Sequence, residues 1–222
     1  MNLPAQLLAG DWLWVANAIF ALFLYRAVRY APWRILLDNA VMVNALVGLV
    51  FGAFIFWQFN AGIRPGFNFH ILGSTLFMLM FGWQIATVSI TLVMLATWLR
   101  ADMGVVTLGI NGLLMIALPV LFSDWLLRFS KHHLPKNLFL FVLWNGFFCS
   151  MLTIVLNVTA TTLLLLALSR YTWGEIQHYY LVASPILMLT EGFVTGMMIT
   201  AFTVFQPQAV MNFSDEEYLA GK

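Results

Sequence analysis

One stretch decides how this chain folds: it opens with Phe69-His70-Ile71-Leu72-Gly73 and closes with Leu108-Gly109-Ile110-Asn111. Two apolar segments, 71–81 and 85–99, lie between these motifs, and Gly82 separates them. A single helix over both segments would be more than about 40 Å long, whereas the hydrocarbon core of a bilayer is about 30 Å thick. The sequence therefore predicts a hinged pair of helices that meet near Gly82, the first of them short.

The short helix of this pair cannot cross a bilayer alone, so neighbouring helices or a water-filled cavity must shelter it. Such an arrangement is expected near a binding site. His70 stands at the entrance to the short helix, and neutral imidazole is the commonest metal ligand in proteins. His70 is therefore a candidate ligand; the alternative is a polar anchor at the membrane interface.

The composition is that of an all-α, polytopic integral membrane protein. Of the 222 residues, 62% are hydrophobic and only 9% are charged, and the mean hydropathy is +0.91. Soluble domains are about a quarter charged. We expect a single transmembrane domain over residues 1–222 in a lipid bilayer. The net charge of +1 indicates no nucleic-acid partner, and the single cysteine, Cys149, excludes an intrachain disulfide.

Hydropathy predicts about seven transmembrane helices, including the hinged pair. The expected spans are Trp12–Tyr25, Leu37–Phe59, Ile71–Phe81, Ile85–Leu99, Val105–Phe122, Leu138–Leu168 and Tyr179–Phe205. The sixth is long enough to tilt strongly or to bend near Asn145-Gly146. Two glycine pairs, Gly48/Gly52 and Gly192/Gly196, have the spacing that lets a neighbouring helix approach closely.

The basic residues predict the orientation of these spans. Positive charges follow the first apolar segment rather than precede it, so we expect a transmembrane helix with its N-terminus outside rather than a signal peptide. Six basic residues then fall in cytoplasmic loops and three outside, as the positive-inside rule expects: Arg26, Arg29, Arg34, Arg128, Lys131 and Lys136 inside, and Arg64, Arg100 and Arg170 outside. This layout places Met1, Asn2, Asp11, His70, Asp102, Glu175 and His178 near the outer face, and His132 and His133 in an inner basic loop.

Six short motifs occur along the chain in a fixed order. They are Met-Asn-Leu-Pro at 1–4, His-Ile-Leu-Gly-Ser at 70–74, Gly-Trp-Gln at 82–84, the stretch from Asp102 to Asn111, Glu-Gly-Phe-Val-Thr at 191–195, and Gln-Pro-Gln at 206–208. In order and spacing they resemble the CbiM/NikM family, the cobalt- and nickel-specific membrane subunits of energy-coupling factor transporters. The resemblance covers nearly the whole chain.

The resemblance implies a metal site made by the N-terminal amine, the second residue and the histidine that opens the short helix. In this sequence these residues are Met1, Asn2 and His70. The family has histidine where Asn2 stands, and an amide oxygen is a weaker donor than imidazole for nickel or cobalt. Two outcomes stay open: a weakened site, or a divergent member that has lost the metal.

Four further residues are candidates near such a site. His178 is either a compensating ligand or, as we favour, an interfacial histidine beside Tyr179 and Tyr180. Glu191 lies deep in the last span, where ionisable groups are rare and usually functional; it either serves the ion or fixes helix packing, and the sequence favours neither. Asp102 and Asn111 either shape the cavity or cap helices, and capping is favoured for Asp102.

By its resemblance the chain is a substrate-capture subunit for cobalt or nickel in a bacterial plasma membrane, working with a transmembrane coupling subunit and ATPases. The chain has no Gly-x-x-x-x-Gly-Lys-Ser/Thr loop for ATP. It also has no Gly-x-Ser-x-Gly or His-Glu-x-x-His motif, so we expect no enzyme and no cofactor beyond a bound Co²⁺ or Ni²⁺. The alternative is a stand-alone protein of the same fold that binds another ligand or partner.

Overall fold

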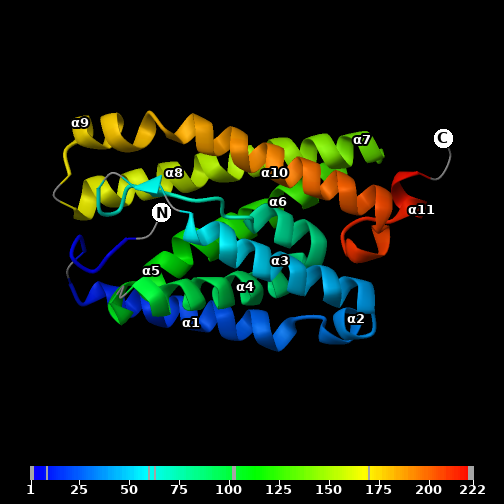
Figure 1. Ribbon diagram of the computed structural model, residues 1–222, viewed down its shortest axis with the longest axis horizontal. Coiled ribbons are helices and arrows are strands. Elements are labelled where there is room, and N and C mark those ends of the chain that lie inside the picture. Colours follow the sequence, from blue (N-terminus) through cyan, green and yellow to red (C-terminus); the bar gives the residue numbers. More distant parts are fainter. Residues whose placement is uncertain are drawn as a thin grey trace.

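The computed structural model is a bundle of helices that run along one common axis (Figure 1). It describes residues 3–8, 10–59, 61–62, 64–101, 104–169 and 171–219. The first half contains α1 (Trp12–Tyr30), α2 (Trp33–Leu37), α3 (Ala40–Gln58), β1 (Ala61–Gly62), β2 (Asn68–Phe69), α4 (Ser74–Ala101), η1 (Val105–Thr107) and α5 (Leu108–Gly112). The second half contains η2 (Leu113–Ala117), α6 (Leu118–His133), α7 (Leu138–Leu140), η3 (Phe141–Phe148), α8 (Cys149–Leu168), α9 (Trp173–Ile176), η4 (Gln177–Leu181), α10 (Ser184–Phe205), η5 (Pro207–Ala209) and α11 (Asp215–Tyr218).

Five helical segments in the described part of the chain are long and apolar enough to cross a membrane. They are Ala40–Gln58, Ser74–Leu99, Val105–His133, Leu138–Leu168 and Trp173–Phe205. This confirms the all-α, polytopic class. α1 is not among the five, and Arg26 and Arg29 near its C-terminal end lower its hydropathy. The exact number of seven spans therefore stays a prediction.

The predicted hinge at Gly82 is present inside α4. Gly82 has φ +76° and ψ 163°, a conformation that only glycine adopts readily. The arm before it runs toward the C-terminal end of α10, where the Met80 carbonyl accepts a hydrogen bond from the Met211 amide. The arm after it runs back beside α1, starting with Trp83 stacked on Phe23. The two arms therefore fold back on each other (Figure 1).

The first arm, residues 74–81, is buried along its whole length. Eight residues span about 12 Å, far less than a bilayer core. Its last carbonyls are satisfied by the chain after α10: Asn212 donates from Nδ2 to the carbonyls of Met78 (2.9 Å) and Leu79 (3.2 Å). The expectation that neighbours shelter a short helix is confirmed.

Two regions predicted as basic loops are largely helical. α1 continues to Tyr30 and α6 continues to His133, so Arg26, Arg29 and Arg128 lie on helices. Positive charges in the last turns of a helix are favoured by its dipole, and long basic side chains reach the interface while their stems stay on the helix. Asp11 occupies the N-cap position of α1, but its side chain makes no capping hydrogen bond.

The long span Leu138–Leu168 is one helix with a local π-helical segment. η3 covers residues 141–148 and contains Asn145 and Gly146, the position of the bend that the sequence offered as an alternative to a strong tilt. Gly146 packs against α10: a Cβ added there would lie 2.8 Å from Ile199 Cγ2. The wider turn thus coincides with a close helix contact.

The two glycine pairs differ. A Cβ added at Gly192 would lie 2.8 Å from Met151 Cγ, and one at Gly196 would lie 3.4 Å from Phe147 Cβ. This pair brings α10 close to α8 and η3, as predicted. A Cβ added at Gly48 or Gly52 would meet no atom of the described chain within 4 Å, so the prediction that α3 packs closely through this pair is wrong for the isolated chain.

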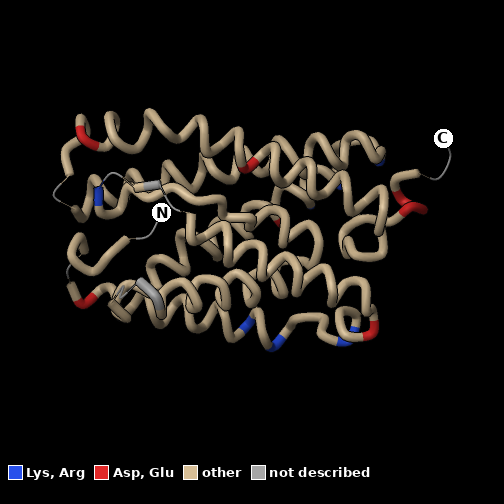
Figure 2. Tube along the Cα trace, in the orientation of Figure 1, with Lys and Arg blue, Asp and Glu red and all other residues tan. Residues whose placement is uncertain are grey.

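Charged residues are sparse, and they lie at both ends of the bundle as well as at a few places along it (Figure 2). Near α11, Glu217 pairs with Lys136 at 2.9 Å and with Lys131 at 4.0 Å. At the other end Arg64 pairs with Glu175 at 2.8 Å. The pairs Lys136–Glu217, predicted inside, and Arg64–Glu175, predicted outside, thus join different segments of the chain.

Candidate metal site

The turn that leads from His70 into α4 is held by a carboxyl group from a distant helix. Glu191 Oε2 accepts from the Leu72 amide at 2.8 Å, and Glu191 Oε1 accepts from the Gly73 amide at 2.6 Å. Glu191 is only 1% exposed. Both amides belong to residues that precede Ser74, the first residue of α4, and an N–H group shielded from water needs an acceptor. Glu191 therefore joins the backbone of this turn to α10.

His70 lies at the start of this turn and is 4% exposed. Its ring packs on Trp57 with a centroid distance of 4.5 Å and a tilt of 46°. Nδ1 lies 3.4 Å from the Ile71 carbonyl oxygen, whereas Nε2 is buried and has no hydrogen-bond partner among the described residues. Burial lowers the pKa of His70 well below its ordinary value, which favours the neutral imidazole that metal ions bind.

Asn111 forms hydrogen bonds with Leu3, at the start of the described chain. Asn111 Oδ1 accepts from the Leu3 amide at 2.8 Å, and Nδ2 donates to the Leu3 carbonyl at 3.0 Å. Nδ2 also donates to the Thr107 carbonyl at 3.0 Å. Leu3 is completely buried and Asn111 is 6% exposed. The side-chain amide of Asn111 thus closes a ring of two hydrogen bonds with one residue, Leu3.

Asn17 on α1 ties the same region from the other side. Its Oδ1 accepts from the Gly109 amide at 2.5 Å, and its Nδ2 donates to the Val106 carbonyl at 3.2 Å. Glycine is required at 109, because an added Cβ would lie 2.3 Å from the Asn17 Cα. α5, which carries Asn111, is therefore pressed directly against α1.

The segment before α4 also touches the N-terminal segment. A Cβ added at Gly66 would lie 2.6 Å from Leu7 Cδ1 and 3.5 Å from Leu3 Cδ2. Phe67, next in sequence, is fully buried and packs on Tyr180 with ring centroids 5.7 Å apart. The structure therefore brings the chain just after residues 1–2 against the chain just before His70.

The other predicted site residues are placed as follows. Met1, Asn2 and Asp102 lie outside the described residues. His178 is exposed and its ring meets the edge of Tyr179 with centroids 4.8 Å apart, a contact that fits the interfacial interpretation. Among the described residues there is no group of three or more His, Cys, Asp or Glu side chains that would hold a metal ion.

Sequence reasoning missed two residues that shape this region. Trp57 was expected only near the end of a span, and nothing local separates it from an interfacial tryptophan. Asn17 did leave a signal, since it is the single polar side chain of the predicted span Trp12–Tyr25 apart from Tyr25 itself. A lone amide inside an apolar span must find a partner in the protein.

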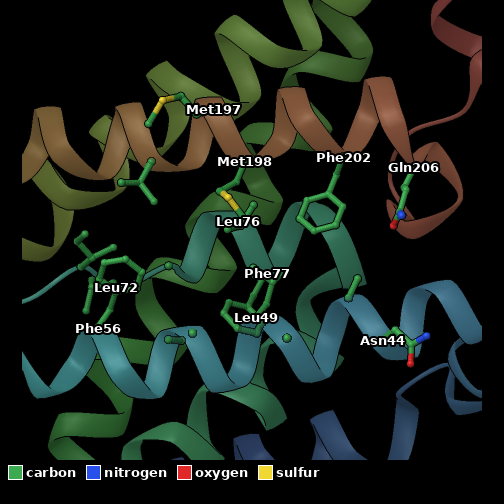
Figure 3. Close-up of a pocket in the computed structure, with 17 residues that line it drawn as sticks. Asn44, Leu49, Phe56, Leu72, Leu76, Phe77, Met197, Met198, Phe202 and Gln206 are labelled. Atoms are coloured by element: carbon green, nitrogen blue, oxygen red, sulfur yellow. The ribbon is translucent and has the colours of Figure 1, made fainter.

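An open groove of about 650 Å³ runs along the bundle between α3 and α10, with the first arm of α4 at its base (Figure 3). Leu76, Phe77 and Met198 lie along it, and Asn44 and Gln206 stand at one end. The groove reaches Ile71, Leu72 and Gly73 but His70 is not in its lining. It is therefore a separate feature that adjoins the turn held by Glu191.

A hydroxyl network links the start of α4 to the core of the bundle. Thr75 Oγ1 lies 2.8 Å from Ser123 Oγ, which lies 3.1 Å from Thr153 Oγ1. These side chains come from α4, α6 and α8. The short first arm is thus fixed by polar contacts as well as by packing.

Comparison with known proteins gives consistent results for fold and family. Two solved structures are similar to this chain. One is described as a truncated transition metal transporter, with TM-score 0.75, 20% identity, and 92% of this chain and 99% of that chain covered. The other is described as a transition metal transporter, with TM-score 0.73, 21% identity, and 92% and 93% covered. A search of the curated proteins found no match.

A family described as the cobalt uptake substrate-specific transmembrane region matches residues 2–209. This match spans nearly the whole chain, and the five long apolar helical segments, the hinge and the buried turn lie within it. The family consists of transport proteins rather than enzymes. The chain therefore belongs to the CbiM family.

Proposed function

We propose that this chain is the substrate-capture subunit of a transition-metal uptake system and that cobalt or nickel is its cargo. The supporting observation is the buried imidazole of His70, whose Nε2 has no partner among the described residues. A buried polar atom without a partner is costly, and a metal ion would remove that cost. The family description, which names cobalt uptake, supports the same assignment.

The proposed ligands are the Met1 amine and the His70 imidazole, with Asn2 as a weak third donor. The two hydrogen bonds between Asn111 and Leu3 support this set of ligands. Successive Cα atoms are 3.80 Å apart, so the Cα of Met1 stays within about 8 Å of that of Leu3. A firmly held Leu3 thus limits where the amine can lie.

Isothermal titration with Ni²⁺ or Co²⁺ tests this site on the full chain with a native N-terminus. We expect Asn2→His to bind more tightly than the native chain, because imidazole is a stronger donor than an amide oxygen. His70→Ala should abolish the gain, and so should an N-terminal tag, which converts the amine to an amide. Equal binding by the native chain and Asn2→His would refute the proposed ligand set.

Energy for uptake would come from partner proteins, namely the coupling subunit and ATPases of an energy-coupling factor transporter. The supporting observation is the lack of an ATP-binding loop in the sequence. Cells that express this chain alone should accumulate no radioactive cobalt above the control, and cells that also express the partners should. Accumulation by the chain alone, driven by ATP, would contradict the proposal.

We further propose a bacterial inner membrane location with the N-terminus outside. The positive-inside bias supports it. Ser130 is buried, so accessibility labelling is better placed at His132, which is exposed, and at Gly62. A cysteine at 62 should react with an impermeant reagent in intact cells, and one at 132 only after lysis; the reverse pattern would invert the topology.

A second candidate function is binding of another ligand or partner by a protein that has lost the metal. Asn2 in place of histidine favours it, and the groove beside the Ile71–Gly73 turn offers an apolar site. Under this proposal neither the native chain nor Asn2→His binds Ni²⁺ or Co²⁺. The titration above therefore separates the two functions.

A further inference from the structure

We infer that Asn111 and Glu191 are positioning residues: each holds the backbone of one of the two segments that carry the proposed ligands, and together they set the span across which the ion is bound. That these residues serve metal binding rests on the proposed function. That they hold the two backbone segments in place is independent of it and can be tested without a metal.

We call the pair of hydrogen bonds between Asn111 and Leu3 the first clamp; it lies next to the N-terminal residues in sequence. Both hydrogen-bonding groups of the Leu3 residue, its amide and its carbonyl, bond to the one side chain of Asn111. A single hydrogen bond would leave the segment free to swing about it, whereas two bonds in a ring fix its direction. Asn2 and Met1 directly precede Leu3, which these two bonds hold in place.

The second clamp is the pair of hydrogen bonds from the Leu72 and Gly73 amides to Glu191, next to His70 in sequence. Glu191 takes the amides of Leu72 and Gly73 with its two oxygens, so it too makes two bonds to one short piece of backbone. Gly73 has φ +71°, a conformation unfavourable to other residues. The carboxyl group therefore holds the turn in one shape, and His70 stands two residues before it.

Simple helix capping does not account for Glu191. A cap accepts from the amides of the first helical residues, whereas Glu191 accepts from Leu72 and Gly73, which precede Ser74, the first residue of α4. The side chain that accepts from Leu72 follows it by 119 positions in the chain. The bond therefore fixes α4 and its turn relative to α10.

The two clamp residues belong to helices that pack closely against neighbouring helices. Asn111 belongs to α5, where a Cβ added at Gly112 would lie 2.5 Å from the Phe20 ring of α1. Glu191 is followed by Gly192, which packs on Met151 of α8. Side chains on helices that are themselves locked by packing hold a site more precisely than loops do. Two separate helices thus define where the two ligand segments lie.

The test is disulfide formation between the two segments in the full chain. The parent carries Asn2→Cys and His70→Cys, with Cys149→Ser to remove the native thiol. We expect the disulfide to form in this parent. Asn111→Leu or Glu191→Gln should slow it by about fivefold or more, because losing a partner in a buried hydrogen bond corresponds to at least such a factor. Glu191→Gln keeps one acceptor and turns an amide group toward the other N–H.

Asn157→Leu is the matched control. Asn157 is also a buried asparagine that donates to a backbone carbonyl, that of Leu114, and it touches neither ligand segment in the described contacts. Its disulfide rate should stay near that of the parent. Asn111→Asp keeps the acceptor for the Leu3 amide but turns a carboxyl oxygen toward the carbonyls of Leu3 and Thr107, so it should also slow the disulfide. Glu191→Gln covers the case in which the Asn111 variants do not fold.

Three outcomes would overturn the inference: no disulfide in the parent, an unchanged rate in Asn111→Leu and Glu191→Gln, or an equal loss in Asn157→Leu. Nickel titration of the clamp variants, made in the Asn2→His chain, adds the functional readout. Clamp-dependent disulfide formation without nickel binding in any form upholds the inference and rejects the proposed function. Nickel binding with clamp-independent disulfide formation does the opposite.

Discussion

α3 and α4 follow each other in the chain, yet they meet opposite surroundings. α3 is the more apolar of the two, but only 11% of its most apolar 18-residue stretch is buried within the protein, against 72% for that of α4. In water the more apolar helix would be the more buried. In a bilayer, lipid is as apolar as leucine, so hydrophobicity alone gives no reason to leave the membrane. Burial follows the groups that need protein partners.

The buried helix is the one whose polar side chains are buried. Ser74, Thr75, Thr87 and Thr91 are all buried on α4, and the last two donate to carbonyls one turn earlier, at 2.7 Å each. The short first arm also exposes helix ends that lipid cannot satisfy. The clamp by Glu191 and the bonds from Asn212 supply those partners. The difference between the helices is therefore one of hydrogen-bonding need.

Removing the clamp should give the largest effect on the buried side. Glu191→Leu leaves the amides of Leu72 and Gly73 buried without partners, at about 1–3 kcal/mol for each group. Thr190→Val at the next position loses only a bond to the Ile186 carbonyl of its own helix. Thermal unfolding in detergent should show a strong loss for Glu191→Leu and little change for Thr190→Val. Equal effects would remove the contrast between buried and lipid-facing positions.

The glycine pairs should give the next largest contrast. Gly192→Leu drives a side chain into Met151 and Phe147, and overpacking of this kind costs about 1–3 kcal/mol. Gly48→Leu meets open space within the chain and should change the free energy of unfolding by less than about 0.5 kcal/mol. Purified single chains in detergent provide the measurement. Equal destabilisation by both would show that α3 packs more closely than the structure indicates.

The hinge should respond more mildly. A Cβ added at Gly82 meets only the Gln84 Oε1 at 3.5 Å and the Met211 Sδ at 3.7 Å, so space is available. The cost of Gly82→Ala then comes from the backbone alone, about 1–2 kcal/mol for a left-handed conformation. Gly52→Ala, in a regular helix, should be neutral or stabilising. A fully stable Gly82→Ala would mean that the two arms are not folded back at this residue.

The smallest effect is expected at the end of the bundle. Lys136 pairs with Glu217 at 2.9 Å, but its side chain is 52% exposed. Exposed ion pairs are worth about 0–1 kcal/mol and weaken with salt. Lys136→Ala should lower the melting temperature slightly at low salt and not at high salt. A large, salt-independent loss would show that the segment after α10 does more than cover the end of the first arm.

Some features followed from local sequence alone. The length of the apolar stretch after His70, set against the thickness of a bilayer, predicts a break at Gly82, and the break is there. Unbroken hydropathy predicts the span Leu138–Leu168, which the structure repeats with the same bounds. Both depend on neighbouring residues and on one external dimension, and such properties can be read from the chain in order.

The clamps and the glycine contacts were decided by tertiary structure. Asn111 and Leu3 are 108 positions apart, and Glu191 and Leu72 are 119 apart. Gly48/Gly52 and Gly192/Gly196 have the same spacing, yet among the described residues only the second pair meets a neighbouring helix. In the sequence, an amide or carboxyl group within an apolar span indicates that a hydrogen-bond partner is needed, and a glycine pair indicates that another helix can approach. Helix packing decides which group becomes the partner, because hydrogen bonds and close contacts between helices form only after the whole bundle has assembled.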